Sequence, residues 1–237
     1  MEETGKNPIQ VAERLFQVIE RLAENGPMGI MDLSAELGFH KSTTHRLVTS
    51  LQYMGYIRQD EESLKYALSL KFLEIGSKIL EQTNMASLIH PSLKKLSEQT
   101  GETVHLVRRE GTEAVYIDKV ESTVSSIRMV SRVGSRIPLY CSGVGKALLA
   151  ELPDPEIEDI WNSSEITSLT PYTVTSLSDL MDRIRGVREA GFAMDDEENE
   201  EGVRCIAVSI PDYHKEPVYA LSISAPVSRM TDARIAA

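Results

Sequence analysis

The sequence predicts an α+β protein in two parts: a helical N-terminal third that ends in a small β-hairpin, and a second part in which helices flank an antiparallel sheet. Apolar residues recur every three or four positions up to residue 54, which is the spacing of amphipathic helices. From Glu102 the period changes to two, which is typical of strands. With 237 residues and 41% hydrophobic content, the chain is long enough and apolar enough for two folded domains.

Three helices are expected at the start of the chain, joined by short turns. The first covers residues 8 to 25 and ends before Gly26-Pro27. A short second helix around Leu33 ends at Gly38, because glycine permits the tight turn that must follow. The third helix runs from about His40 to Met54. This order of helices with a glycine turn predicts a helix-turn-helix.

A two-stranded hairpin is expected directly after the third helix. Residues 56 to 58 predict one strand, residues 60 to 63 its turn, and the alternation from Leu64 to Leu68 the return strand. We therefore assign residues 1–69 to a winged helix-turn-helix domain. Helical spacing then returns, and residues 70–84 are interpreted as a linker helix.

The remaining part, residues 85–237, is expected to form a second domain. The expected elements are a helix over 85–99 broken or entered near Pro91, a hairpin around Glu110-Gly111, one or two strands between 125 and 139, helices over 141–152, 155–161 and 178–190, and two long strands around a turn at residues 212–215.

The third helix has two chemically different faces. At about 100° per residue, one face carries the apolar set Thr44, Leu47, Val48, Leu51 and Met54. The opposite face carries Lys41, Ser42, His45, Arg46 and Thr49. These polar types contact phosphates and base edges. No Asp or Glu occurs between Glu36 and Asp60, so this region is basic although the whole chain is acidic.

We expect this helix face and the hairpin to bind DNA. Taken alone, the face would equally suit an ordinary solvated helix. The hairpin favours DNA, because a wing lies beside the duplex backbone. The expected contacts are Lys41, Ser42, Thr43, His45 and Arg46 on the helix, with Arg58 and Lys65 on the wing. The sequence does not decide which of them reads a base.

Composition limits the other classes of function. The net charge of −11 disfavours a general nucleic-acid coat but allows a local basic surface. The two cysteines, Cys141 and Cys205, lie far apart in sequence and form no CxxC pair, so no zinc or disulfide framework is indicated. Charges in the first residues disfavour a signal peptide, and no apolar stretch is long enough to span a membrane. A cytoplasmic protein is expected.

Short motifs in both parts of the chain match those of one known family. In the first part they are Lys41-Ser42-Thr43, Arg46-Leu47 and Gly55-Tyr56. In the second part they are ETVHL, AVYIDKVES, IPLYCSGVGKALLA, GFAMDDEENEEGVRCIAVSI and ALSISAPVSRM, in the same order as in that family. On these motifs the chain resembles the IclR family of bacterial transcription regulators. Family chains usually continue as a helix after the last strand. Only residues 230–237 follow here, so that helix is expected to be short or missing.

The resemblance implies a GAF-like effector-binding domain with a pocket on one face of an antiparallel sheet. The family's ligand-contacting positions fall on Met129, Ile137, Gly143, Val144, Asp195, Val203, Cys205, Ser222 and Ser224. Within the family, IRMVSRVGSRIPLY and NEEGVRCIAVSI are most similar to regulators of 2-keto-3-deoxygluconate and pectin-sugar catabolism.

The residue types at these positions suit a small oxo- or hydroxy-acid. Ser142 to Gly145 open a helix after a strand, and a helix start can hold a carboxylate. Ser222 and Ser224 share one side of a strand, and Asp195 could accept hydrogen bonds from ligand hydroxyls. Taken singly, each position has an ordinary alternative: the serines as sheet residues, Cys205 as a core residue and Asp195 in a solvated acidic loop.

The expected partners are double-stranded operator DNA, a small organic acid such as 2-keto-3-deoxygluconate, and further copies of the chain. Resemblance to the family suggests a repressor. We expect a homodimer formed mainly through the winged domains and linker helices, which would read a pseudo-palindrome. The family suggests a tetramer built as a dimer of dimers. No cofactor or metal is expected.

Two other classes of function stay open. An enzyme is disfavoured because Gly145-Lys146 lacks the rest of a phosphate loop, with Tyr140 and Ala147 at the deciding positions, and no GxSxG or HExxH occurs. Zinc bound by Cys141, Cys205 and His105 would give a metal-dependent or sugar-acid-processing enzyme. A sensor that binds protein through its winged domain is the third class.

Overall fold

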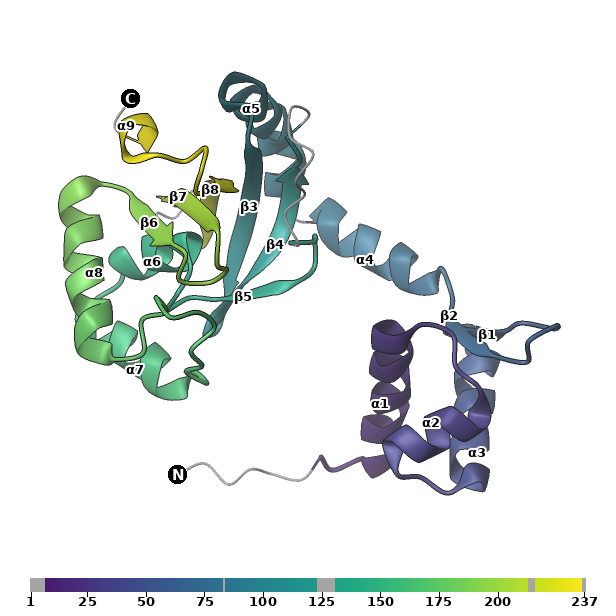
Figure 1. Cartoon of the computed structure of the whole chain (residues 1–237). Helices are drawn as coiled ribbons and strands as arrows, with labels where there is room; N and C mark the ends of the chain where they lie inside the picture. The colour runs from purple at the N-terminus through teal and green to yellow at the C-terminus, as the bar shows by residue number, and fades with distance from the viewer. Residues whose placement is uncertain (1–6, 83, 123–130, 213–215, 236–237) are drawn as a thin grey trace. The chain divides into compact units, whose positions relative to one another are not determined.

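A computed structural model of the chain describes residues 7–82, 84–122, 131–212 and 216–235, with the backbone alone for residues 79–82 and 84–87 (Figure 1). The chain divides into two compact units, Met1–Gln82 and Thr83–Ala237. Each unit has its own hydrophobic core. The helix Lys71–Gln82 belongs to the first unit in this division. A separate linker helix over residues 70–84 therefore stays a prediction.

The first unit is three helices followed by a two-stranded hairpin and a fourth helix. Its core is formed by side chains that α1, α2 and α3 direct inward, with Val18, Leu33 and Val48 fully buried. The elements are α1 (Gln10–Asn25), α2 (Ile30–Leu37), α3 (Lys41–Tyr53), β1 (Ile57–Gln59), β2 (Tyr66–Leu68) and α4 (Lys71–Gln82). Strands β1 and β2 pair antiparallel, as the wing prediction requires.

Local backbone geometry explains why the turn between α2 and α3 is tight. Gly38 ends α2 with φ of 64°, a left-handed conformation that costs a side-chain-bearing residue energy. His40 precedes α3 as its N-terminal cap in extended conformation. The prediction that Met54 belongs to the buried helix face is wrong, because α3 ends at Tyr53 and Met54 is partly exposed.

The second unit is built on a six-stranded antiparallel sheet with the strand order β5-β4-β3-β8-β7-β6. The strands are β3 (Thr103–Glu110), β4 (Glu113–Val120), β5 (Arg136–Pro138), β6 (Ala193–Asp196), β7 (Val203–Ile210) and β8 (Tyr219–Pro226). The helices are α5 (Asn84–Thr100), α6 (Gly143–Ala150), α7 (Asp154–Ser163), α8 (Leu177–Ala190) and α9 (Asp232–Ile235).

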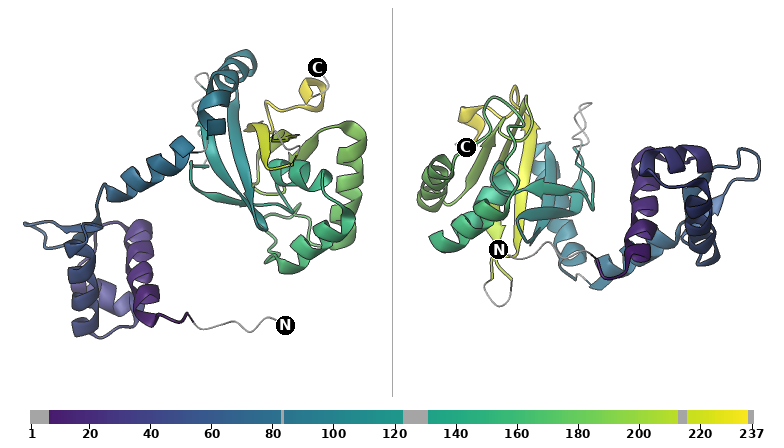
Figure 2. Two further views of the ribbon diagram at one scale, coloured as in Figure 1. Left: turned by 180° about the vertical axis from the view of Figure 1, so that it is seen from behind. Right: turned by 90° about the horizontal axis from the view of Figure 1, so that it is seen from below.

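Alternation along the strands separates the two faces of this sheet. Val104 and Leu106 on β3 pack with Leu93 of α5 on one face. Val107 faces the other side and joins the larger core under α6, α7 and α8. Figure 2 shows these helices and α5 around the sheet from two further directions. The side chain of His105 therefore lies on the α6 side of the sheet, together with that of its cross-strand partner Ser222.

Several boundaries differ from the sequence prediction. Strand β6 was not predicted, because its four residues, Ala193–Asp196, run into a series of acidic residues. Pro91 lies inside α5 rather than at its start. Helix α9 is short, as expected. Of the strands expected between residues 125 and 139, only β5 lies among the described residues.

None of the helices in the described part of the chain combines the length and apolar character needed to cross a membrane.

Candidate nucleic-acid interface and ligand pocket

The polar face of α3 is exposed along its length. Thr44, Leu47, Val48 and Leu51 are buried against α1 and α2. The predicted DNA contacts Lys41, Ser42, His45 and Arg46 are exposed, and Thr43 is half-buried. This is the separation of faces that a recognition helix needs, because base and phosphate contacts require free side chains.

The wing adds exposed cations and exposed acids. Arg58 and Lys65 are both exposed, so each is free to reach a phosphate. The turn between them carries Asp60, Glu61 and Glu62, of which Asp60 accepts hydrogen bonds from the backbone and hydroxyl of Ser63. A carboxylate at the wing tip would repel DNA phosphates. The exposed face of α3 is therefore the stronger candidate for contact with DNA.

The second unit contains a cavity of about 290 Å³ on the α6 side of the sheet. Eight of the predicted effector contacts line it, namely Ile137, Gly143, Val144, Asp195, Val203, Cys205, Ser222 and Ser224. They come from β5, α6, β6, β7 and β8, so the fold brings together positions up to 87 residues apart in sequence. The ninth, Met129, lies outside the described residues.

The start of α6 forms one wall of this cavity. Ser142 caps the helix: its Oγ accepts a hydrogen bond from the Gly145 amide at 3.1 Å and donates one to the Pro138 carbonyl at 2.6 Å. Among the described residues, no acceptor satisfies the amides of Gly143 and Val144. Two free N–H groups and the positive end of a helix can bind a carboxylate.

The two glycines of α6 have different roles. A Cβ on Gly145 would collide with the backbone of Leu139, so this glycine allows α6 to pack against the preceding chain. A Cβ on Gly143 would lie 3.6 Å from the Cβ of Asp195, an ordinary contact. Packing against Leu139 is by itself enough to require glycine at position 145.

Asp195 is buried rather than solvated, which corrects the acidic-loop alternative. It lies on β6 at 3% exposure, opposite Cys205 of β7. Its Oδ1 accepts hydrogen bonds from the amides of Glu198 at 2.8 Å and Asn199 at 3.3 Å. Burial is the main effect on its carboxyl group and raises the pKa to about 7, although Lys146 and the two amides act in the opposite direction.

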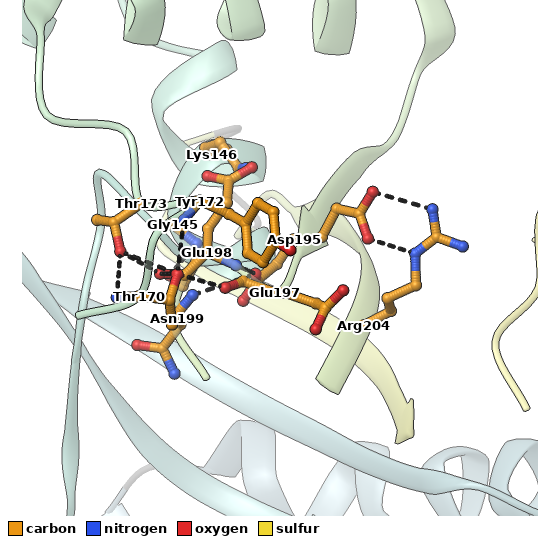
Figure 3. A network of polar contacts seen from close by, with 12 residues as sticks. Gly145, Lys146, Thr170, Tyr172, Thr173, Asp195, Glu197, Glu198, Asn199 and Arg204 are labelled. Carbon is orange, nitrogen blue, oxygen red and sulfur yellow. Dashed lines mark hydrogen bonds and ion pairs between the residues drawn. The ribbon is translucent and has the colours of Figure 1, made fainter. Parts of the chain in front are cut away.

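Asp195 is part of a polar network that fixes the β6–β7 loop (Figure 3). Lys146 of α6 forms a buried ion pair with Glu198 of this loop. The hydroxyls of Thr170 and Thr173 donate to the Glu198 carbonyl at 3.4 and 2.6 Å, and Thr170 also bonds to the preceding carbonyl at 2.7 Å. These bonds fix the loop at Glu197 and Glu198, and its next two residues, Asn199 and Glu200, line the cavity.

His105 was missed as a pocket residue, apart from its place in the zinc hypothesis. Its Nε2 lies 2.7 Å from Oγ of Ser131, and its Nδ1 lies 3.3 to 3.4 Å from the hydroxyls of Ser222 and Ser224. Burial, and secondarily Lys119, lowers the pKa of its imidazole to about 3, so the ring is neutral at physiological pH. A neutral ring offers one donor and one acceptor to these hydroxyls.

Besides Ser142, the remaining lining residues are polar groups that the sequence did not single out: Tyr116, Ser131, Ser135, Arg136, Asn199 and Glu200. The period-two pattern of a strand shows which residues share a face. It does not show which polar residue of that face ends beside a helix start. The lining therefore combines hydroxyls, a buried carboxyl group and an apolar side formed by Ile137, Val144 and Val203.

The structure does not support the zinc hypothesis. Cys141 is buried outside the cavity lining, whereas His105 and Cys205 line it. In the described residues, no group of three or more His, Cys, Asp or Glu side chains is placed to hold a metal ion. Burial raises the pKa of the Cys141 thiol to about 12 and that of Cys205 further, so both thiols are protonated without a metal.

Two family models together match most of the chain. Residues 11–61 match the IclR helix-turn-helix domain, and residues 77–237 match the C-terminal domain of the bacterial transcriptional regulator IclR. The chain belongs to the IclR family. It is therefore a DNA-binding transcription regulator and not an enzyme.

Curated relatives of this IclR-family protein match it along almost its full length. The transcriptional repressor IclR of Escherichia coli is 36% identical over 96% of this chain and 84% of the relative. The regulators XynR and KdgR of the same organism are 38% and 36% identical, covering 96% and 97% of this chain and 90% and 88% of the relatives. These similar identities do not separate the subfamilies.

Solved structures of the family share the fold. The Thermotoga maritima IclR structure superposes with a TM-score of 0.80 at 32% identity, covering 96% of this chain and 92% of that one. The C-terminal domain of Escherichia coli KdgR gives a TM-score of 0.55 at 37% identity, covering 61% of this chain and 82% of that one. The α+β prediction, with a helix-turn-helix and an antiparallel-sheet domain, is confirmed.

Proposed function

We propose that this IclR-family regulator is a repressor whose operator binding is controlled by a small organic acid held in the cavity at the start of α6. The observation that carries the proposal is the convergence of eight family-matched positions on one cavity. Unsatisfied amides at a helix start suit a carboxylate, and the surrounding hydroxyls suit a polyhydroxylated chain.

The acid we favour is a keto-sugar acid such as 2-keto-3-deoxygluconate. The described lining contains five serines, one buried carboxyl group and one neutral imidazole, against three aliphatic side chains. These groups already bond within the protein, but they keep further hydrogen-bonding capacity that a hydroxyl-rich ligand can use and an aromatic ring cannot. The relatives named KdgR agree with this choice, and the name repressor recurs among the other relatives.

DNA binding is assigned to the exposed face of α3, with Lys41 and Arg46 as its cations. A homodimer would present two such helices to a pseudo-palindromic operator. Phe16 on α1 and Leu73 on α4 are large apolar side chains of the first unit at 61% and 68% exposure. Burying them between two copies would stabilise the dimer that we expected through this domain.

Binding to a duplex from the protein's own promoter region tests the proposal. Fluorescence anisotropy from 50 to 300 mM salt should give an affinity that falls steeply with salt. Addition of 2-keto-3-deoxygluconate should then release the duplex, whereas benzoate should not. Absence of salt-dependent binding would favour the protein-binding sensor instead. Binding that no acid of a keto-acid and sugar-acid panel changes would refute effector control.

A further inference from the structure

Asp195 lies beside the start of α6, where the proposed effector carboxylate would bind. A Cβ on Gly143, the first residue of α6, would be 3.5 Å from the Asp195 amide nitrogen and 3.6 Å from its Cβ. Asp195 Oδ1 is occupied by two loop amides. Within the described residues, no hydrogen bond is made by its other oxygen, Oδ2, and the residue lines the cavity.

Among the described residues, each cation near Asp195 already has a protein partner. On α6, Lys146 is paired with Glu198 of the loop. On β5, Arg136 is half-exposed and paired with Glu110 and Glu113. On β4, Lys119 pairs with Glu121 at 3.1 Å and donates to the Ser131 carbonyl.

The other titratable groups that face Asp195 in the described part of the chain carry no positive charge. They are His105 on β3, Tyr116 on β4, Cys141 before α6, Cys205 on β7 and Glu200 on the loop. Burial keeps the imidazole, the phenol and both thiols neutral. In the described part of the site, the buried charged groups are Lys146, Glu198 and Asp195. The charge of Lys146 is balanced by Glu198, so an ionised Asp195 would add a net negative charge and repel an anionic ligand.

Two carboxylates that share a confined site are stabilised when they share one proton. We propose that Asp195 binds the effector in its protonated form, donating a hydrogen bond from Oδ2, so that effector binding takes up one proton from solvent. This inference rests on the proposed function, because it requires an acidic effector in the cavity. It reverses the role expected from sequence, in which Asp195 accepts hydrogen bonds from ligand hydroxyls.

The pKa of Asp195, about 7 without ligand, sets the pH range. Below that pH the proton is already present and the affinity is constant. Above it, each bound effector must recruit a proton, so the affinity falls about tenfold per pH unit until the pKa of the bound state is reached. The effector carboxyl itself is ionised throughout this range.

Isothermal titration of 2-keto-3-deoxygluconate into the full-length protein tests the inference. At pH 8, heats measured in phosphate and in Tris should differ by the ionisation enthalpies of the buffers and give uptake approaching one proton per site. Asp195→Asn keeps an oxygen for the two loop amides and a donor toward the ligand. We expect this variant to show no proton uptake, equal affinity at pH 6 and 9, and about 100-fold tighter binding than wild type at pH 9.

Glu189→Gln on α8 is the matched control, because it removes an exposed carboxyl group that does not line the cavity and should leave proton uptake unchanged. Circular dichroism and thermal unfolding establish that both variants fold. Equal wild-type heats per site in both buffers, or an Asp195→Asn variant that loses affinity equally at pH 6 and 9, would overturn this inference alone. Failure of 2-keto-3-deoxygluconate, pyruvate and D-gluconate to bind wild type would overturn the proposed effector control together with it.

Discussion

Nζ of Lys146 on α6 lies 2.5 Å from Oε1 of Glu198 in the β6–β7 loop, with both side chains at most 4% exposed. The pair links the helix whose start forms one wall of the cavity to the loop whose Asn199 and Glu200 form another. Asp195 and the two threonines hold the same loop through backbone bonds (Figure 3). The shape of the cavity therefore depends on a charge pair that does not itself line it.

Removing one partner of this pair should destabilise the second unit strongly. Lys146→Met leaves the carboxylate of Glu198 buried without a cation, and such losses cost about 3–5 kcal/mol. The double variant Lys146→Met/Glu198→Leu removes both charges and should recover most of that loss. Urea denaturation measures each free energy of unfolding.

The exposed pair between Arg185 and Asp182 on α8 provides the control. Arg185→Ala should change the free energy of unfolding by less than about 1 kcal/mol, because solvent screens exposed ion pairs. If Lys146→Met lowers the free energy of unfolding by as little as Arg185→Ala does, the buried pair does not hold the loop.

The raised pKa of Asp195 makes a second prediction, about stability and pH. In the unfolded chain its carboxyl group ionises near 3.8, and in the folded protein near 7. The protonated carboxyl group therefore makes its full contribution to the free energy of unfolding below about pH 4, and this contribution is lost as the pH rises to 7. The loss is about 4 kcal/mol at most, because one pKa unit corresponds to about 1.4 kcal/mol.

The Asp195→Asn variant isolates this contribution, since an amide does not titrate. Relative to wild type, the variant should gain stability steadily between pH 4 and 7 and remain constant above pH 8. Urea denaturation at several pH values measures the difference. A wild-type-minus-variant difference that does not change with pH would show that Asp195 has an ordinary pKa in the folded protein.

Much of this fold follows from local patterns. The apolar spacing of α1 and α3, the left-handed turn at Gly38 and the period-two segments of β3, β7 and β8 are all visible in sequence. Helix α6 is also visible, because Ser142 is a typical cap before an apolar run. Each of these features depends on neighbours a few residues away.

The features that the sequence did not predict depend on distant partners. Asp195 and Glu198 are the first and last of four consecutive acidic residues, and strand β6 ends within this run. Such a run alone indicates a solvated loop, whereas both side chains are buried. Lys146, 52 positions before Glu198, compensates the charge and makes burial possible. His105 faces the cavity only because β8 lies beside β3, with Ser222 opposite it.

The serines opposite and next to His105 give a third prediction. Ser222→Ala with Ser224→Ala removes two hydroxyls from the cavity wall and the two contacts of His105 Nδ1. Effector affinity should fall by one to two orders of magnitude, since each lost hydrogen bond is worth about 1 kcal/mol and an unpaired buried group costs more. Operator affinity without effector should remain near wild type.

Ser209→Ala on β7 is the control, because Ser209 bonds to Glu151 away from this cavity. Titration of 2-keto-3-deoxygluconate and of the operator duplex measures the two affinities for each variant. If the double variant loses operator and effector affinity in equal proportion, the serines serve the fold rather than the ligand.

Arg46 gives the last prediction, which concerns the other unit. It is exposed in the middle of the polar face of α3, four residues after Ser42 and on the same side of the helix. Arg46→Ala should weaken operator binding while leaving effector affinity unchanged. Arg183→Ala, an exposed arginine on α8, makes the same change of charge and should leave operator binding near wild type.

The way in which Arg46→Ala weakens binding also reveals what Arg46 contacts. If it contacts a phosphate, affinity falls similarly for all sequences and the salt dependence decreases by about one unit per contact. If it contacts a guanine, the loss is about 1–3 kcal/mol and discrimination relaxes at one base position of each half-site. Anisotropy titrations over several salt concentrations, with the operator and with single-base variants of it, distinguish these results. Unchanged affinity for every duplex would remove Arg46 from the interface.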